Sequence, residues 1–295
     1  MTKNLKGSLI LLLTAIIWGT SFVSQKLGMN DVGPFTFMGL RTLLGAIVLL
    51  PFIIITDAKK APEERTSFRD KKLLLGGSVC GIFLCIASCL QTFGMVYIDA
   101  GKAGFLTSLY MIFVPIIGIF IGKKLNLKTV FAVLLAVFGM YLLCMKNGFS
   151  SIGKGDVLVL LCAVLFAFHI LTIDKFSPGV DAVKLSCLQF AVAGALATIC
   201  MFIFEKPPIE AVLASAGPIM YSGIMSCGVA YTLQVVGQKY AEPTVASIIM
   251  SLESVFAALS GAVFLGEVMI PREIMGCAIM FIAVIYIQLP RLKRR

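Results

Sequence analysis

Charged residues are scarce in this chain. Only 14% of its 295 residues are charged, 59% are apolar, and the mean hydropathy is +0.99. Soluble globular domains contain about 25% charged and about 45–50% apolar residues. The composition therefore excludes a soluble enzyme, a disordered chain and a secreted module held by disulfides, and it indicates an integral membrane protein.

Metal ligands are equally scarce. The sequence has one histidine, and its nine cysteines include no C-x-x-C pair, although zinc sites usually need several such residues at defined spacings. All nine cysteines fall in apolar segments, so we interpret them as small packing residues. We expect neither a metal nor a cofactor.

Long apolar runs, in contrast, are abundant. A helix needs about 20 mostly apolar residues to cross a bilayer, and ten such segments follow one another, with 57–72 the only sizeable polar loop between them. The sequence therefore predicts an all-α integral membrane protein with ten transmembrane helices. They are expected at 7–27, 34–56, 73–95, 101–121, 127–145, 156–173, 181–204, 211–238, 243–265 and 271–289.

The basic residues indicate the orientation. With an even number of spans, both termini lie on one side of the membrane. Of the 25 Lys and Arg residues, 18 fall on that side, 6 on the other, and Arg41 lies inside a span. Because cytoplasmic segments are rich in Lys and Arg, we expect a multi-pass protein of the cell membrane with both termini in the cytoplasm. The net charge of +10 then reflects topology, and no nucleic-acid partner is expected.

The sequence also contains an internal repeat. At an offset of 143 residues, nine of 33 positions are identical between 90–122 and 233–265, including the spacing Gln-x-x-Gly-x-x-Tyr. A weaker match at offset 148 aligns Trp18 with Phe166 and Arg41 with Gln189. The chain is therefore expected to consist of two repeats.

We place the first repeat at 1–147 and the second at 148–295, with five spans each. Because five is odd, the second repeat enters the membrane from the opposite side, and the two repeats are inverted. Inverted repeats are typical of secondary transporters, whose substrate site lies near the midplane. Alternating access between the repeats follows from this arrangement.

Several short motifs resemble those of a known transporter family. They are Trp18-Gly19-Thr20-Ser21, Arg41, Ser108-Leu109-Tyr110, Phe113-Val114-Pro115, Leu252-Glu253-Ser254-Val255-Phe256-Ala257-Ala258-Leu259, Phe264-Leu265-Gly266-Glu267 and Gly276. Together they are similar to the EamA family of the drug/metabolite transporter (DMT) superfamily, over nearly the whole chain. The resemblance implies a ten-helix transporter, often an exporter of amino acids or related metabolites, with a central cavity lined by both halves.

Two charged residues lie within the predicted spans. Arg41 lies seven residues past Pro34, and Glu253 lies ten past Pro243, which places them roughly 10 and 15 Å from the opposite faces of the membrane. A charge at this depth needs a partner or a wet cavity. Either the two residues form a structural ion pair or are solvated separately, or Glu253 binds the substrate amine or a coupled proton.

Further polar and aromatic residues are candidates for the cavity wall: Trp18, Gln91, Tyr110, Phe168, His169, Tyr231 and Gln234. His169 is either an interhelical hydrogen-bond donor or a proton relay. Gln91 and Gln234 either join helices or line the cavity, because amides in hydrocarbon need partners. Pro115, whose counterpart in the second repeat is Ala258, predicts a kink in the first repeat only.

The sequence therefore favours a secondary transporter, exporter or facilitator, of small organic metabolites such as amino acids, working as a monomer or homodimer in the lipid bilayer. The alternatives are an intramembrane enzyme and a channel or non-transporting membrane scaffold. The sequence shows no zinc motif, no G-x-S-x-G nucleophile and no paired aspartates. It also shows no filter segment or ring of charges of the kind that channels have. We therefore predict that the protein is not an enzyme.

Overall fold

The computed structural model describes residues 3–61, 65–98, 100–123, 125–144, 152–265 and 268–289, and the regular structure there is helical. It confirms ten helices that are long and apolar enough to cross a membrane.

The boundary predicted between the repeats, at residue 147, lies outside the described residues. The first repeat contains α1 (Lys3–Gly28), α2 (Pro34–Ala58), α3 (Lys71–Met95), α4 (Ala100–Ser108), α5 (Tyr110–Phe120) and α6 (Leu127–Cys144). The second contains α7 (Lys154–Phe176), α8 (Ala182–Cys200), η2 (Met201–Glu205), α9 (Ile209–Ala214), α10 (Ala216–Tyr221), η3 (Ser222–Tyr231), α11 (Thr232–Gln238), α12 (Pro243–Met250), α13 (Glu253–Leu265) and α14 (Pro271–Gln288).

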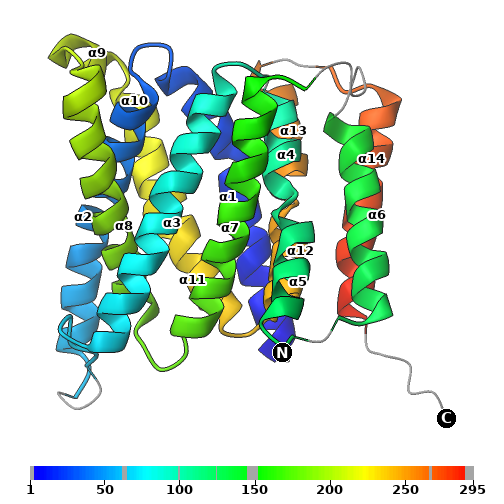
Figure 1. Cartoon of the computed structure of the whole chain (residues 1–295), viewed down its shortest axis with the longest axis horizontal. Helices are drawn as coiled ribbons and strands as arrows, with labels where there is room; N and C mark the ends of the chain where they lie inside the picture. The colour runs from blue at the N-terminus through cyan, green and yellow to red at the C-terminus, as the bar shows by residue number, and fades with distance from the viewer. Residues whose placement is uncertain are drawn as a thin grey trace.

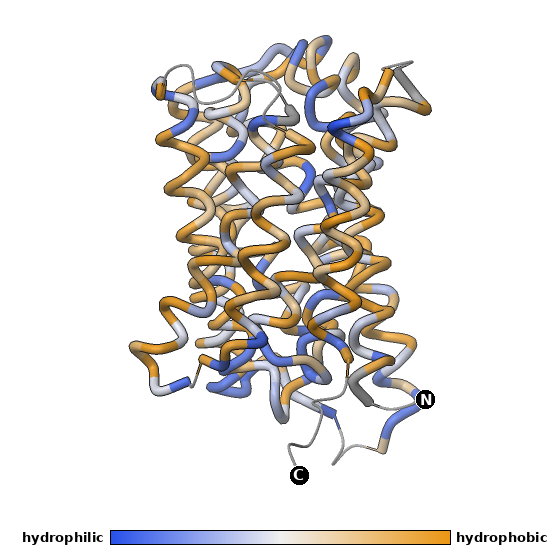
Figure 2. Tube along the Cα trace, turned by 90° about the vertical axis from the view of Figure 1, so that its right-hand side faces the viewer, coloured by the Kyte–Doolittle hydropathy of each residue, from blue (hydrophilic) through white to orange (hydrophobic). Residues whose placement is uncertain are grey.

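The outer surface of the bundle is apolar. Large side chains such as Ile54, Phe120 and Val263 are 67%, 85% and 76% exposed. Figure 2 shows hydrophobic residues along the middle of the helices and hydrophilic residues gathered at both ends. Soluble monomers rarely expose apolar surface on this scale, so the bundle is built to be covered by lipid. The protein is a multi-pass membrane protein.

The two repeats run in opposite directions. α1 begins and α14 ends at the same end of the bundle, at the bottom of Figure 1, whereas α7 begins at the other end. We call the first of these the terminal end and the second the distal end. The inverted arrangement predicted from the odd number of spans is therefore present.

The repeats interlock instead of forming two separate bundles. The most extensive helix contacts join α2 to α8, α3 to α7 and α6 to α14, each pair taking one helix from each repeat (Figure 1). The main hydrophobic core likewise draws its residues from both repeats. The interior of the protein is thus the interface between its two halves.

Glycine permits the closest of these contacts. α6 and α14 cross at Gly139 and Gly276, where a Cβ atom on Gly276 would lie 2.5 Å from the backbone oxygen of Gly139. Real Cβ atoms do not approach a backbone oxygen so closely, so this crossing depends on the missing side chain. Small residues serve the same purpose at many helix interfaces in membranes.

Polar contacts fasten α2 to the α8–η2 helix at both ends. At the terminal end, Lys184 donates to Asp57 at 2.5 Å, although the lysine side chain is only 3% exposed. At the distal end, Glu205 accepts from the backbone N–H groups of Phe35 and Thr36, at 2.9 and 2.7 Å, and from the Thr36 hydroxyl. The carboxylate thus satisfies N–H groups at the start of α2, where the helix has no partner of its own for them.

The eighth span differs from its prediction. The expected helix over 211–238 is divided into the short α9 and a span over Ala216–Gln238. Pro218 lies in the first turn of α10, where its lack of an N–H costs no helical hydrogen bond, so a new helix begins at this point. The middle of the span, η3, is π-helical, a form that is frequent at functional sites.

Candidate functional site

Two helices are interrupted at equivalent positions. The fourth span is divided into α4 and α5 at Leu109, and the ninth into α12 and α13 at 251–252. The offset of 143 that aligns the repeats places Leu109 opposite Leu252. The prediction of a kink in the first repeat only is therefore wrong, because both repeats are interrupted.

The two interruptions differ in their local residues. In the first repeat, Pro115 lies within α5, six residues past Leu109, and it lacks the N–H that would bond to the carbonyl of Met111. In the second, serine hydroxyls donate to backbone carbonyls three residues earlier, from Ser251 to Ile248 and from Ser254 to Ser251, each at 2.8 Å. Such bonds compete with the regular helix ladder and bend helices.

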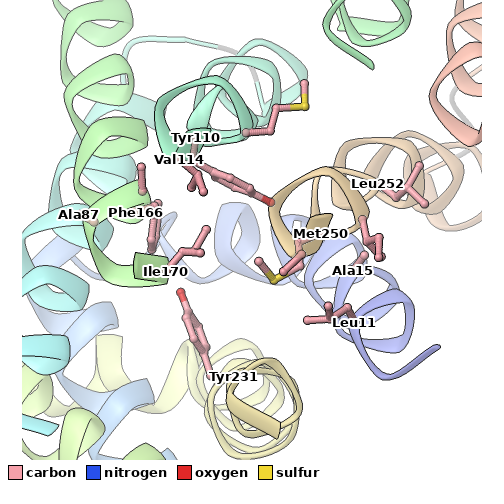
Figure 3. Packing of buried hydrophobic residues seen from close by; sticks show 14 of the residues in the cluster. Leu11, Ala15, Ala87, Tyr110, Val114, Phe166, Ile170, Tyr231, Met250 and Leu252 are labelled. Carbon is pink, nitrogen blue, oxygen red and sulfur yellow. The ribbon is translucent and has the colours of Figure 1, made fainter. Parts of the chain in front are cut away.

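The interruptions meet at a carboxylate. Glu253, the first residue of α13, accepts hydrogen bonds at Oε1 from the hydroxyls of Ser108 at 3.2 Å and Tyr110 at 3.3 Å. These residues flank the interruption of the other repeat. In Figure 3 the Tyr110 hydroxyl points toward the turns that carry Met250 and Leu252. Discontinuous helices that meet in this way form the substrate sites of many secondary transporters.

A cavity opens beside this junction. Seven of the predicted residues line it: Trp18, Arg41, Gln91, Tyr110, Tyr231, Gln234 and Glu253. Six more complete its wall: Phe22, Gln25, Thr107, Phe166, Ile170 and Ser226. The structure thus brings most of the candidates together, and their roles in transport stay predictions.

Lining residues come in repeat-equivalent pairs. The offset of 148 pairs Trp18 with Phe166 and Phe22 with Ile170, and the offset of 143 pairs Gln91 with Gln234 and Tyr110 with Glu253. Both members of all four pairs face the same cavity. The cavity therefore lies on the pseudo-twofold axis that relates the repeats.

Arg41 and Glu253 share the cavity but do not pair. Within the described part of the chain, no ion pair joins them. The Arg41 guanidinium instead donates to the thioether sulfur of Met38 at 3.4 Å and lies 5.5 Å from the Phe37 ring centroid, and its Nε has no partner. Arg41 is only 3% exposed. The structural ion pair considered from the sequence is not present.

His169 and Phe168 do not line the cavity. The His169 ring is completely buried, and its Nε2 donates to Oε1 of Gln189 on α8 at 2.9 Å. This contact is the interhelical hydrogen bond that we considered for it. Phe168 is 38% exposed and stacks on Phe83, with ring centroids 5.6 Å apart, so it faces outward.

The two cavity glutamines have different surroundings. The Gln91 amide donates to Thr107 at 3.1 Å and so links α3 to α4. The Oε1 atom of Gln234 is buried and has no hydrogen-bond partner among the described residues, and Oε1 of Gln25 is in the same state. Buried polar atoms normally have partners, so these oxygens are available to a ligand or to water.

Aromatic rings form one wall. Trp18 of α1 packs edge-on against Tyr231 at the end of η3, with ring centroids 4.6 Å apart. Gly19 permits α1 to approach closely there, because a Cβ at this position would meet the backbone oxygen of Glu253 at 2.8 Å. The sequence Trp18-Gly19 thus places the indole, whose Nε1 is unpartnered, beside the carboxylate helix.

The cavity is narrow in this conformation. Its free volume is about 40 Å³, enough for a few water molecules and too little for a metabolite. The described residues contain no cluster of three or more His, Cys, Asp or Glu that would hold a metal ion. The lining residues present charged and hydrogen-bonding groups to the cavity, which does not admit a metabolite in this conformation.

Ser108 and the six further lining residues, Gln25 among them, were not predicted as site residues. The Ser108 signal was present, because the offset of 143 that pairs Tyr110 with Glu253 also pairs Ser108 with Ser251. Residues on the axis of an inverted repeat face their own counterparts. Gln25 has no such signal, since its position depends on how α1 is rotated.

Comparison with known proteins gives a consistent picture. The model of the EamA-like transporter family matches residues 5–145 and 153–289. The chain is 31% identical to an uncharacterized transporter of Archaeoglobus fulgidus over 97% of this chain and 87% of the relative. It is 25% identical to the uncharacterized transporter YoaV of Bacillus subtilis over 88% and 89%. A crystal structure with 19% identity superimposes with a TM-score of 0.75 over 96% of both chains, which shows a shared fold.

Proposed function

Because this chain belongs to the EamA-like transporter family, we propose that it is a secondary transporter of small organic metabolites such as amino acids, acting as an exporter or facilitator. It works by alternating access between its inverted repeats. The observation that carries this proposal is the cavity on the pseudo-twofold axis, bounded by two interrupted helices.

The symmetry of the cavity supports alternating access. Four pairs of equivalent residues, with one member from each repeat, line the wall, and the two repeats run in opposite directions. Because the repeats are inverted, a movement of one repeat that opens the cavity toward one side of the membrane has a counterpart in the other repeat. That counterpart opens the cavity toward the opposite side. The narrow cavity suits an intermediate between these two states.

The proposal includes location and coupling. The bias of 18 basic residues to 6 supports a cell-membrane protein with its terminal end in the cytoplasm. Glu253, the one carboxylate among the described lining residues, is the group that would bind a coupled proton. The remaining partners are the bilayer and the solute, with no resident cofactor, in a monomer or a homodimer.

Counterflow in liposomes tests the function. Purified protein is reconstituted with an unlabelled amino-acid mixture inside, and uptake of labelled amino acids is measured against protein-free liposomes. We expect saturable uptake that increases with the inside concentration. Chemical conversion of the solute would indicate an enzyme, and flux that does not saturate would indicate a channel. Either result would contradict the proposal.

A further inference from the structure

Arg41 is a buried cation without an anionic partner among the described residues. Its guanidinium contacts the sulfur of Met38 and the ring of Phe37, and its Nε atom makes no hydrogen bond. A thioether is a weak acceptor, and neither contact neutralises the charge. Because a guanidinium matches a carboxylate in shape and charge, Arg41 retains the capacity to bind one.

Glu253 is the complementary case. It is 5% exposed, and its two hydrogen bonds come from the neutral hydroxyls of Ser108 and Tyr110, both to Oε1. No described residue bonds to Oε2 or supplies a cation. Hydrogen bonds from hydroxyls orient the carboxylate and leave its charge uncompensated, so Glu253 retains the capacity to bind an ammonium group.

The two charges face one cavity from different repeats. Arg41 projects from α2 of the first repeat, Glu253 begins α13 of the second, and both line the cavity. We propose that Arg41 and Glu253 form a two-point site for a zwitterion with an apolar side chain, in which Arg41 binds the carboxylate and Glu253 the ammonium group. This assignment rests on the proposed transport function.

The rest of the wall fits such a solute. Phe22, Phe166 and Ile170 provide apolar surface, and the unpartnered Oε1 of Gln234 accepts a further N–H of the ammonium group. A solute with one charge leaves either Arg41 or Glu253 buried and unpaired. Unpaired buried charges are costly, so the site selects against simple amines and simple carboxylic acids.

Three ligands with the same side chain test the assignment. Binding of L-leucine, 3-methylbutylamine and 4-methylpentanoate is measured by calorimetry on the full chain in lipid nanodiscs at neutral pH. The second lacks the carboxylate of leucine and the third lacks its ammonium group. We expect leucine to bind about tenfold or more tightly than either analogue, since each charge-assisted contact contributes about one order of magnitude in affinity.

Two variants then assign the contacts. Arg41→Gln is expected to weaken leucine about tenfold and leave the amine unchanged, whereas Glu253→Gln is expected to weaken leucine equally and leave the acid unchanged. The exposed Arg69 and Glu210 lie outside the cavity, so Arg69→Gln and Glu210→Gln are matched controls and should bind all three ligands like the wild type. Arg41→Lys, which keeps the positive charge, should retain the preference for leucine over the amine.

Several outcomes would overturn the two-point site. One is an analogue that binds the wild type as tightly as leucine, and another is an Arg41→Gln variant, eluting as a folded monomer or dimer, that still prefers leucine over the amine. Saturable counterflow of a solute that lacks one of the charges, in protein that does not bind leucine, would also overturn it. That last result would refute the two-point site and leave the proposed transport function intact. Conversely, if the protein binds leucine but shows counterflow of no solute, the transport function is refuted and the two-point site is not.

Discussion

Asp57 and Glu205 lie 148 residues apart, at equivalent positions of the two repeats, and each carboxylate binds near the start of the second transmembrane helix of the other repeat. Their partners, Lys184 and Thr36, are also 148 residues apart. A carboxylate contact between equivalent helices is therefore made once at each end of the bundle, to a lysine side chain at the terminal end and to backbone N–H groups and a hydroxyl at the distal end. The two contacts hold α2 against the α8–η2 helix at both ends.

The stability of the protein should depend on the ion pair between Asp57 and Lys184. In the Asp57→Asn variant, Lys184 stays buried without its anionic partner, which should cost about 1–3 kcal/mol of unfolding free energy. The double variant Asp57→Asn/Lys184→Met removes the stranded charge as well, so it should unfold at a higher temperature than the single variant. Thermal unfolding followed by circular dichroism measures both. A double variant less stable than Asp57→Asn would show that the lysine stabilises the fold without this acid.

Acidification should weaken a neighbouring contact. Burial favours a higher pKa for Asp181, but the ion pair with Lys60 and the hydrogen bonds from the Lys184 and Val183 backbones outweigh it and hold the pKa below its ordinary value. The stabilisation is therefore present above about pH 4 and is lost as the pH falls through the pKa of the folded state. The melting temperature of wild type should exceed that of Asp181→Asn near neutral pH, and the difference should shrink below about pH 4. A difference that is constant down to about pH 3 would contradict this contribution.

Glu253 should carry the pH response of transport. A glutamine at this position keeps the size and the hydrogen bonds of the side chain but cannot bind a coupled proton. We expect counterflow by Glu253→Gln at saturating solute to be insensitive to a pH gradient that changes the rate of wild type. Glu210→Gln, an exposed site in α9, is the control and should respond like wild type. An unchanged pH response in Glu253→Gln would remove Glu253 from coupling.

The glycine crossing of α6 and α14 should not tolerate even a methyl group. In Gly276→Ala, the new Cβ meets the Gly139 backbone oxygen, and relief requires the helices to separate, at a cost of about 1–3 kcal/mol. Gly104 offers a matched control, because a Cβ there has no neighbour within 4 Å. Gly104→Ala should leave the melting temperature unchanged or raise it slightly, since alanine favours helix over glycine. Equal melting temperatures for the two variants would show that the crossing is not tight.

The sequence predicted the spans and their inversion because both depend on simple counts. The length of an apolar run sets the number of crossings, and an odd number per repeat sets the opposite orientation. The rotation of each helix about its own axis, in contrast, could not be predicted from the sequence. His169 is completely buried and its neighbour Phe168 is 38% exposed, yet both lie in the same apolar run. When lipid and protein interior are equally apolar, hydropathy does not distinguish the two faces.

Charged and polar residues that line the cavity could be recognised from the sequence, whereas the interruption of the ninth span could not. Buried polar residues in a membrane must face protein or a cavity, so Arg41, Glu253 and Gln234 were identifiable individually. The interruption at 251–252 was not, because serine is common in helices and only the hydrogen bonds of Ser251 and Ser254 show that it bends this one. The sequence also did not show that Arg41 and Glu253 form no ion pair. Counting residues along a helix gives the depth of each side chain in the membrane, but not the lateral distance between side chains on two different helices.

The contact between Tyr110 and Glu253 also constrains how this protein could be assembled from parts. A homodimer of identical repeats places the same side chain on both sides of its axis, so a glutamate there would face a second glutamate and be repelled by it. Joining the repeats in one chain lets the two sides differ, with an acid on one and a hydroxyl donor on the other. Separate expression of the halves should therefore yield active protein only when both are present, since two copies of the second half would bring two carboxylates together.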